Sequence, residues 1–347
     1  MDAVDRRLLD QVQAGVPLTP RPFAAVGAAL EILEDEVVRR LGALREEGLL
    51  RQIGAIFETR ACGYESALVA ARVPPREIES AAAMISRHPG VTHCYERDHT
   101  WNLWFTLAVP PESGLGLSGT VERVGAEAGA GSIRVLPALR VFKISARFKL
   151  EEGIDLAPPR TGARSVDEPP VPLGDDEIAA VRVLQRPLPL IEEPFLAAAG
   201  EAGMSQDELL STARELLALG VMRRFAALLH HRRAGFGANV MGVWSVSQDR
   251  VADAGARVAS LSAVSHCYER PTYSDWPYSL FSMIHGKSRE ECVAVIDEIR
   301  RMIAPDEDAA LWTVREFKKT RLQLFTAEYA AWERARPGAS VACALSR

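Results

Sequence analysis

The sequence has no run approaching the roughly 20 consecutive apolar residues that a helix needs to cross a bilayer, although 48% of its 347 residues are hydrophobic. This argues against a transmembrane helix. The first ten residues, MDAVDRRLLD, are charged from the second position onward and resemble neither a signal peptide nor a lipidation signal. We therefore expect a cytoplasmic protein that has no membrane partner.

Cysteine pairs and an excess of positive charge are also missing. The five cysteines include no CxxC pair, which argues against a zinc knuckle and against a disulfide framework. Lys and Arg number 41 against 46 Asp and Glu, a net charge of −5, whereas a constitutive nucleic-acid binder usually carries a basic face. The remaining composition is that of a globular chain long enough for about two domains.

The most informative feature of the sequence is a duplicated pentapeptide. HCYER at residues 93–97 recurs at residues 266–270, an offset of 173 residues or about half the chain. Five identities that include His, Cys and Tyr are improbable by chance. The flanks also correspond: residues 63–64 with 235–236, 102–105 with 279–282, and 139–143 with 314–318. We interpret the chain as an internal repeat of two copies.

Each copy begins with three short predicted helices. They cover residues 5–14, 22–30 and 35–47 in copy one, and 175–185, 193–202 and 205–219 in copy two. Asp175 and Ser205 suit helix N-caps, and Gly48 and Gly220 suit C-caps. Three helices that close on a glycine indicate a helix-turn-helix or winged-helix unit.

A strand-rich region follows each helical unit. In copy one we predict strands at 52–60, 66–72, 91–98, 102–109 and 133–145, and helices at 75–87 and 116–128; copy two repeats the order from residue 223 to 319. After the first connecting strand the order is βαββαβ, which is the ferredoxin-like arrangement.

These patterns predict an α+β protein built as a tandem repeat. The segments are helix-turn-helix unit 1 at 1–50, ferredoxin-like domain 1 at 51–150, a linker at 151–174, helix-turn-helix unit 2 at 175–221, and ferredoxin-like domain 2 at 222–337. The linker contains five prolines, a composition typical of an extended, semi-rigid connection.

The order of elements resembles the Lrp/AsnC transcriptional regulators, which dimerise through ferredoxin-like domains of the AsnC type. Two sets of motifs resemble a specialised branch of that group, the siroheme decarboxylases. HCYER at 93–97 and NLWFT at 102–106 resemble the first subunit type; HRRAGF at 231–236, NVMGVW at 239–244, HCYERP at 266–271 and DWPYSLFSMIHG at 275–286 resemble the second.

The resemblance covers nearly the whole chain and implies a natural fusion of the two subunit types. It implies that siroheme loses carbon dioxide from its acetates at C12 and C18, giving 12,18-didecarboxysiroheme for heme d1 or for a siroheme-dependent heme route. No cofactor is implied beyond the substrate siroheme, an iron-bearing tetrapyrrole. Two departures exist: Ser279 stands where Asn is usual, and residues 338–347 match nothing in the family.

The repeated motif offers the groups that a flat polyanion needs. Alternate side chains of a strand share a face, so His93, Tyr95 and Arg97 are expected to point together, as are their counterparts at 266, 268 and 270. Arginine suits acetates and propionates because its planar fork binds a carboxylate through two hydrogen bonds. Cys94 and Cys267 face the opposite way and are interpreted as small buried apolar residues.

Decarboxylation requires a proton for the carbon that loses carbon dioxide, and histidine is the natural donor near neutral pH. We predict His93 and His266 in that role, one in each pseudo-equivalent pocket, with His99 and His231 as further candidates. His231 is also the candidate axial ligand of the siroheme iron, since imidazole often ligates iron and its counterpart Thr59 cannot.

The predicted substrate-binding residues are those able to pair with carboxylates or contact the ring: Arg60, Tyr95, Arg97, Trp101, Arg232, Tyr268, Arg270, Trp276 and His285. Plain alternatives exist for several of them. The tyrosines could close a hydrophobic core, the tryptophans could pack an interface, and Arg60 and Arg232 could be solvated strand-end charges. Because His285 has no histidine counterpart in copy one, the two pockets are not expected to be equally competent.

DNA binding is not expected, although helix-turn-helix units often serve it. The recognition helices would begin with Glu34-Asp35-Glu36 and Gln206-Asp207-Glu208, which phosphates would repel and which lack the cluster used to read bases. We interpret these units as retained scaffold. The alternatives to the enzyme are an Lrp/AsnC-type regulator that senses an amino acid or a tetrapyrrole, and a tetrapyrrole carrier. The fused chain is a pseudo-dimer that could act alone or assemble into a further homodimer.

Overall fold

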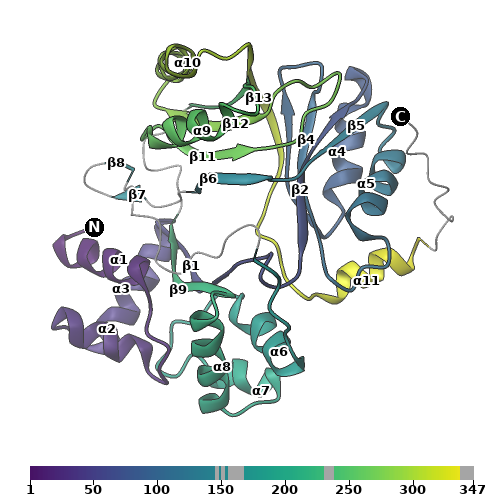
Figure 1. Ribbon diagram of the computed structural model, residues 1–347. Coiled ribbons are helices and arrows are strands. Elements are labelled where there is room, and N and C mark those ends of the chain that lie inside the picture. Colours follow the sequence, from purple (N-terminus) through teal and green to yellow (C-terminus); the bar gives the residue numbers. More distant parts are fainter. Residues whose placement is uncertain (145–147, 150–152, 155–167, 230–237, 337–347) are drawn as a thin grey trace. The chain divides into compact units, whose positions relative to one another are not determined.

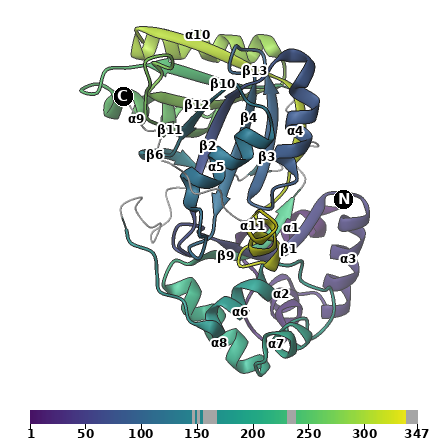
Figure 2. The same ribbon diagram turned by 90° about the vertical axis from the view of Figure 1, so that its right-hand side faces the viewer.

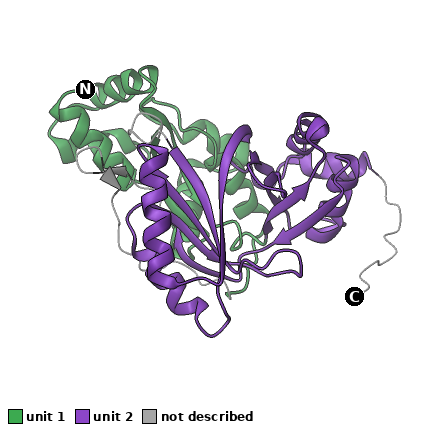
Figure 3. Ribbon diagram, turned by 90° about the horizontal axis from the view of Figure 1, so that it is seen from above, with its two compact units in different colours: residues 1–63, 148–235 green, residues 64–147, 236–347 purple. Residues whose placement is uncertain are grey.

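The computed structural model describes residues 1–144, 148–149, 153–154, 168–229 and 238–336. The chain divides into two compact units, one of residues 1–63 and 148–235 and the other of residues 64–147 and 236–347 (Figure 3). Each unit therefore combines equivalent segments from both copies of the repeat. Within the described residues, no helix is both long enough and apolar enough to span a membrane.

The first unit contains the two groups of three helices. They are α1 (Ala3–Ala14), α2 (Pro22–Leu30) and α3 (Glu34–Glu46), and α6 (Asp175–Leu184), α7 (Leu196–Ala202) and α8 (Gln206–Ala218). Ser205 caps α8 through a capping box with Glu208, as predicted. The N-cap prediction at Asp175 is wrong by one residue: Gly174 is the N-cap of α6, because the carboxylate of Glu177 reaches back to its N–H.

The strand that follows each helical group pairs with its counterpart from the other copy. Strands β1 (Leu50–Phe57) and β9 (Met222–Leu229) form a two-stranded antiparallel sheet. Gly48 and Gly220, each with a φ of 70°, end the preceding helices in the left-handed conformation that glycine adopts without strain. A second short pair, β7 (Phe148–Lys149) and β8 (Gly153–Ile154), lies between β1 and β9 in the sequence.

The second unit contains both ferredoxin-like domains (Figure 1). The first copy supplies β2 (Glu65–Arg72), α4 (Ile78–Ser86), β3 (Val91–Arg97), β4 (Leu103–Val109), α5 (Gly116–Glu127), β5 (Ser132–Leu136) and β6 (Arg140–Ile144). The second copy supplies β10 (Ala238–Ser245), α9 (Val251–Ser260), β11 (Val264–Glu269), β12 (Leu280–Gly286), α10 (Arg289–Ile303), β13 (Glu307–Lys319) and α11 (Ala327–Arg334). A 3-10 turn (Pro75–Glu77) precedes α4.

The described strands of this unit form one nine-stranded sheet in the order β5-β2-β4-β3-β13-β10-β12-β11-β6. The predicted single strand at 133–145 is wrong, because the structure divides it into β5 and β6. Pro137 lacks the N–H needed to continue a ladder. Strand β5 pairs with β2 of its own copy, whereas β6 pairs with β11 of the other copy. The two edges of the sheet are therefore joined by only residues 137–139.

Strand β13 of the second copy likewise pairs with strands of both copies, but as one continuous strand. Its first part pairs with β10 and its last part with β3 of the first copy. In both exchanges an arginine binds a glutamate of the other copy, and a lysine binds carbonyls at a helix C-terminus, where a cation is favourable. The contacts are Arg315–Glu96 (2.7 Å) and Lys318 Nζ to Ser86 O (2.7 Å) for β13, and Arg140–Glu269 (3.6 Å) and Lys143 Nζ to Leu261 O (2.7 Å) for β6.

Each copy has its own helix-covered core, and a third core joins them. Helices α4 and α5 cover the first copy's strands and α9 and α10 cover the second copy's (Figure 2). The third cluster, called here the central core, includes Trp101, Trp104, Trp276 and Phe281, each at most 2% exposed. Burial of such aromatic surface from both copies stabilises the pseudo-dimer.

Candidate functional site

The duplicated pentapeptides lie on the equivalent strands β3 and β11, with Arg270 directly after the end of β11, and their alternation is as predicted. The rings of His93 and Tyr95 stack with centroids 6.1 Å apart, and the Arg97 guanidinium lies 5.2 Å from the Tyr95 ring. We call these three residues the first motif face. Cys94 points the other way, into the core under α4.

The second copy repeats the arrangement. His266 and Tyr268 also stack at 6.1 Å, and the Arg270 guanidinium lies 4.7 Å from the Tyr268 ring. These three residues are called the second motif face. Cys267 is buried on the opposite side, where burial raises the pKa of its thiol to about 12. The strand period therefore brings a histidine, a phenol and a guanidinium together twice.

Each motif strand carries a β-bulge immediately before its histidine. Val91 faces Leu107 and His93 faces Thr106, so Thr92 and His93 together oppose one residue. Such a bulge turns two consecutive side chains toward the same side of the strand. The Thr92 hydroxyl consequently lies 2.9 Å from His93 Nδ1.

The second copy has the same bulge, with Ser265 in place of Thr92. Ser265 Oγ lies 2.8 Å from His266 Nδ1 and 2.7 Å from His285 Nε2. In the first copy the hydroxyl instead meets Thr106 Oγ1, at 2.6 Å. Sequence reasoning missed these hydroxyl groups, although the repetition of a hydroxyl residue before the duplicated histidine was a usable signal.

Both motif histidines are held in their neutral form. Burial, followed by the charge of Lys319, lowers the pKa of His93. Burial lowers the pKa of His266 to about 4, and positive charge on His285 and His93 lowers it further. The two motif faces are thus within electrostatic reach of each other, and neither imidazole carries a second proton at neutral pH in the absence of a bound anion.

Arg97 is a buried cation. Its side chain is 6% exposed, and it donates to Leu311 O at 3.1 Å and to Thr313 Oγ1 at 2.8 Å. Among the described residues, no carboxylate lies within ion-pair distance of it. Burial lowers the pKa of its guanidinium to about 10. Because an uncompensated buried charge is costly, this position favours an anion.

The crossing strands place different side chains beside the two motif faces. A bulge in β13 puts Glu316 opposite Tyr95 and Lys319 opposite His93. The equivalent bulge in β6 puts Val141 opposite Tyr268. The first motif face is therefore bordered by charges that the second lacks at that position.

Glu316 has a measurable consequence for Tyr95. Burial raises the pKa of Tyr95 to about 12, and the charge of Glu316 and a hydrogen bond to it add to the rise. Replacing Glu316 by glutamine is expected to lower this pKa, because the negative charge is lost while the burial remains. Ultraviolet titration of tyrosine ionisation, with Tyr95→Phe to assign the signal, measures the change. An unchanged pKa would contradict this account.

Three other predicted residues, His99, Trp101 and Trp276, lie in or against the central core. His99 Nδ1 accepts from Trp101 N–H at 3.0 Å, and the His99 ring lies 5.6 Å from the Trp276 ring. Trp101 and Trp276 are each 1% exposed within the central core, a placement that favours the packing interpretation. Arg60 belongs to the first unit. His231 and Arg232 lie outside the described residues.

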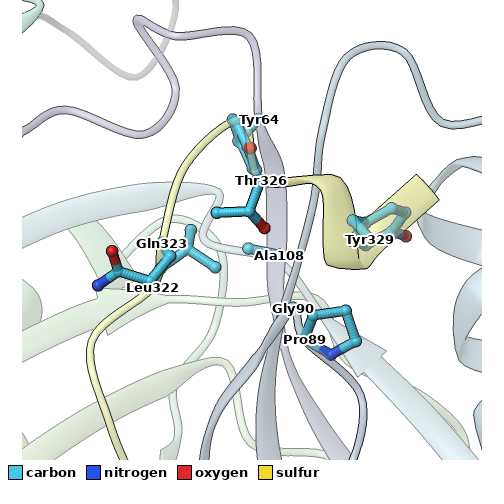
Figure 4. Close-up of a pocket in the computed structure, with 8 residues that line it drawn as sticks. All are labelled: Tyr64, Pro89, Gly90, Ala108, Leu322, Gln323, Thr326 and Tyr329. Atoms are coloured by element: carbon cyan, nitrogen blue, oxygen red, sulfur yellow. The ribbon is translucent and has the colours of Figure 1, made fainter. Parts of the chain in front are cut away.

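A separate pocket lies at the edge of the first copy, under the C-terminal segment (Figure 4). Its lining consists of Tyr64, Pro89, Gly90, Ala108, Leu322, Gln323, Thr326 and Tyr329. None of the predicted site residues lines it. Among the described residues, no cluster of three or more His, Cys, Asp or Glu side chains could hold a metal ion.

Comparisons with known proteins match both kinds of domain. The model of an AsnC-like ligand binding domain matches residues 61–143 and 233–318, and that of a siroheme decarboxylase NirDL-like HTH domain matches residues 5–51 and 177–223. The chain is similar to the siroheme decarboxylase of Hydrogenobacter thermophilus, at 37% identity over 94% of this chain and 96% of the relative. It is similar to the siroheme decarboxylase NirDL subunit of Paracoccus pantotrophus, at 36% identity over 87% and 90%.

Two solved structures are similar over nearly the full length. The crystal structure of the siroheme decarboxylase NirDL has a TM-score of 0.78 and 34% identity, and covers 95% of this chain and 96% of its own. The same enzyme in co-complex with an iron-uroporphyrin III analogue also gives 0.78, at 34% identity over 94% and 96%. The similarity therefore extends over both copies of the repeat rather than one.

Proposed function

The chain belongs to the NirDL-type siroheme decarboxylases, which are carboxy-lyases, as a full-length fusion of two AsnC-like halves, and from this premise we propose that it converts siroheme to 12,18-didecarboxysiroheme. The observation that carries the proposal is the pair of motif faces, each with a neutral histidine, a phenol and a guanidinium. We propose that the product serves heme d1 synthesis.

Decarboxylation requires an oriented acetate group, a site that excludes water, and a supply of protons. Breaking the bond between methylene and carboxylate leaves an electron pair on the methylene carbon, which the adjoining macrocycle delocalises. One proton must then reach that carbon for each carbon dioxide lost. We assign this donation to the imidazoles of His93 and His266, with His99 as a further candidate; the role predicted for His231 rests on residues outside those described.

Binding of the substrate would itself prepare these histidines. The pKa of His266 lies near 4 because the imidazole is buried and, to a smaller extent, because its neighbours are cationic or become so on protonation. A substrate carboxylate brought beside this group of imidazoles and cations offsets their positive charge and favours a proton held within the group. A transferable proton is thus held near the motif face when the substrate is present.

The carboxylates of siroheme would be held by the arginines. Arg97 is the strongest candidate, since it is buried without a described carboxylate partner. Arg270 has the equivalent place, where it also donates to Leu136 O. Tyr95 and Tyr268 would contact the ring edge beside them. Arg60, Arg232, Trp101, Trp276 and His285 stay predicted substrate contacts.

The helix-turn-helix units are proposed to be scaffold rather than DNA readers. The first turn of α3 contains Glu34, Asp35 and Glu36. Asp207 and Glu208 occupy the first turn of α8. These carboxylates would repel the phosphates of DNA.

Anaerobic incubation of the purified protein with siroheme, followed by mass spectrometry of the extracted tetrapyrrole, tests the proposal. The expected result is loss of two carbon dioxide units, with methyl groups found at C12 and C18 by NMR. Siroheme that is recovered bound but unchanged would refute the proposed reaction and support a carrier or sensor. Products with one carbon dioxide lost, or with acetates lost elsewhere, would refute the proposed product.

A further inference from the structure

One hydroxyl group in the second copy connects two imidazoles. Ser265 Oγ lies 2.8 Å from His266 Nδ1 and 2.7 Å from His285 Nε2. The β-bulge in β11 turns Ser265 to the same side as His266, and pairing with β12 brings His285 beside them. Ser265 is 6% exposed, so the connection runs through the protein rather than through bulk water.

The first copy also has a series of hydrogen-bonded hydroxyl groups, but this series ends on a different kind of group. Thr92 Oγ1 lies 2.9 Å from His93 Nδ1 and 2.6 Å from Thr106 Oγ1, which accepts the His93 backbone N–H at 3.1 Å. The series of hydrogen-bonded hydroxyl groups therefore ends on a backbone amide, which cannot supply protons. Ala108 of the first copy occupies the position equivalent to His285. The backbone N–H of each of these two residues donates to the carbonyl of the residue that lies two positions before the bulge residue of the same copy.

We propose that Ser265 is a positioning residue that passes protons from His285 to His266, so that the second motif face is the more active of the two proton donors. This deepens the proposed function and rests on its assignment of His266 as a proton donor. Thr92, in the same place of the first copy, fixes the orientation of His93 without serving as a relay.

One proton is delivered for each carbon dioxide that leaves. The bond between methylene and carboxylate breaks, carbon dioxide leaves, and the electron pair stays on the methylene carbon. That carbon takes the Nε2 proton of His266, His266 Nδ1 takes the hydroxyl proton of Ser265, and Ser265 takes a proton from the protonated Nε2 of His285. His285 becomes neutral as the carbanion does. Exchange with water protonates His285 again and returns His266 to its first tautomer.

The surroundings of His266 explain why a relay is needed. Burial lowers its pKa most. The charged groups that lower it further are His285 from β12, His93 from β3, Arg270 directly after its own strand and Lys143 from β6. A neutral imidazole is a weak acid, and simultaneous delivery of a proton to Nδ1 gives it the acidity of an imidazolium.

The test compares Ser265→Ala with Ser265→Thr and with the matched change Thr92→Ala. Ser265→Ala is expected to lower the decarboxylation rate by about 10- to 100-fold, less than the roughly 10²- to 10⁴-fold contribution of a general acid because His266 itself remains, while the absorption spectrum and affinity of bound siroheme stay unchanged. Ser265→Thr, which restores the side chain of the first copy, should recover most of the rate. Thr92→Ala should retain at least about tenfold more activity than Ser265→Ala.

Rates in mixtures of light and heavy water supply a signature that a packing role would not give. The wild-type dependence on deuterium fraction should be curved, because several protons move together, and that of Ser265→Ala should be linear. Equal losses in the two alanine variants, an unaffected Ser265→Ala, or no recovery in Ser265→Thr would overturn the relay while the wild type still decarboxylates. A wild type that does not decarboxylate would overturn the proposed function and the relay with it.

Discussion

Replacing His266 by glutamine is expected to lower the rate of siroheme decarboxylation by about 10²- to 10⁴-fold, the usual loss when a general acid is removed. Glutamine keeps the size of the side chain and a hydrogen bond to Ser265 Oγ, which lies 2.8 Å from the present imidazole. It cannot give a proton to carbon. Single-turnover conversion, followed by mass spectrometry under anaerobic conditions, measures the loss separately from siroheme binding.

The matched control is His93→Gln on the first motif face. Because the hydrogen-bonded hydroxyl groups beside His93 end on a backbone amide, His93→Gln is expected to lower the rate of conversion much less than His266→Gln. The wild-type spectrum of bound siroheme should be preserved in both variants. A His266→Gln protein that converts siroheme at close to the wild-type rate would rule out His266 as the donor. Accumulation of a product that has lost one carbon dioxide, in His93→Gln alone, would instead show that each face serves one acetate.

The parts of the site that follow from local geometry were predictable from the sequence. The alternation of side chains along a strand requires only the extended backbone, so the shared direction of His93, Tyr95 and Arg97 was foreseen and is confirmed by their ring contacts. The two-copy fold with helix-turn-helix and AsnC-like domains was likewise foreseen from the duplicated motif and the order of elements, and the domain matches confirm it.

The parts that depend on distant pairing were not predictable. Nothing in residues 133–145 says that their second half pairs with β11, more than 120 residues later in the chain. The bulge was also hidden, because it breaks the strict alternation that the prediction used and brings Ser265 to the side of His266. The charges of Glu316 and Lys319 beside the first motif face follow from the same exchange of strands.

Lowering the pH from 7 to 4.5 is expected to reduce the free energy of unfolding by about 2–3 kcal/mol through His88 alone. His88 is 1% exposed, and burial, with the nearby cations Lys318 and Arg336, lowers its pKa to about 3. In the unfolded chain its pKa returns to about 6.5. Between these values the unfolded state binds the extra proton, so stability is complete above about pH 6.5 and is lost as the pH falls toward 3.

The surroundings of His88 explain why its imidazole stays neutral in the folded protein. Its Nδ1 accepts the Gly90 N–H at 3.0 Å, so a proton there would meet another donor. Its ring packs edge-on against Trp332 and Tyr329, at centroid distances of 4.2 and 5.2 Å, and Nε2 has no hydrogen-bond partner among the described residues. Protonation would therefore weaken the packing of His88 against α11.

Urea unfolding followed by tryptophan fluorescence at pH 7 and pH 4.5 measures this loss, and His88→Asn is the matched variant. Asparagine offers a carbonyl oxygen in place of Nδ1 to the Gly90 N–H but does not titrate. The variant is expected to be less stable at pH 7, because it leaves a gap beside Trp332. Its loss on acidification should nevertheless be smaller than that of the wild type by about 2–3 kcal/mol. Carboxylates and the other histidines titrate in both proteins and cancel in this difference, so an equal acid loss in the two would exclude His88 as the source.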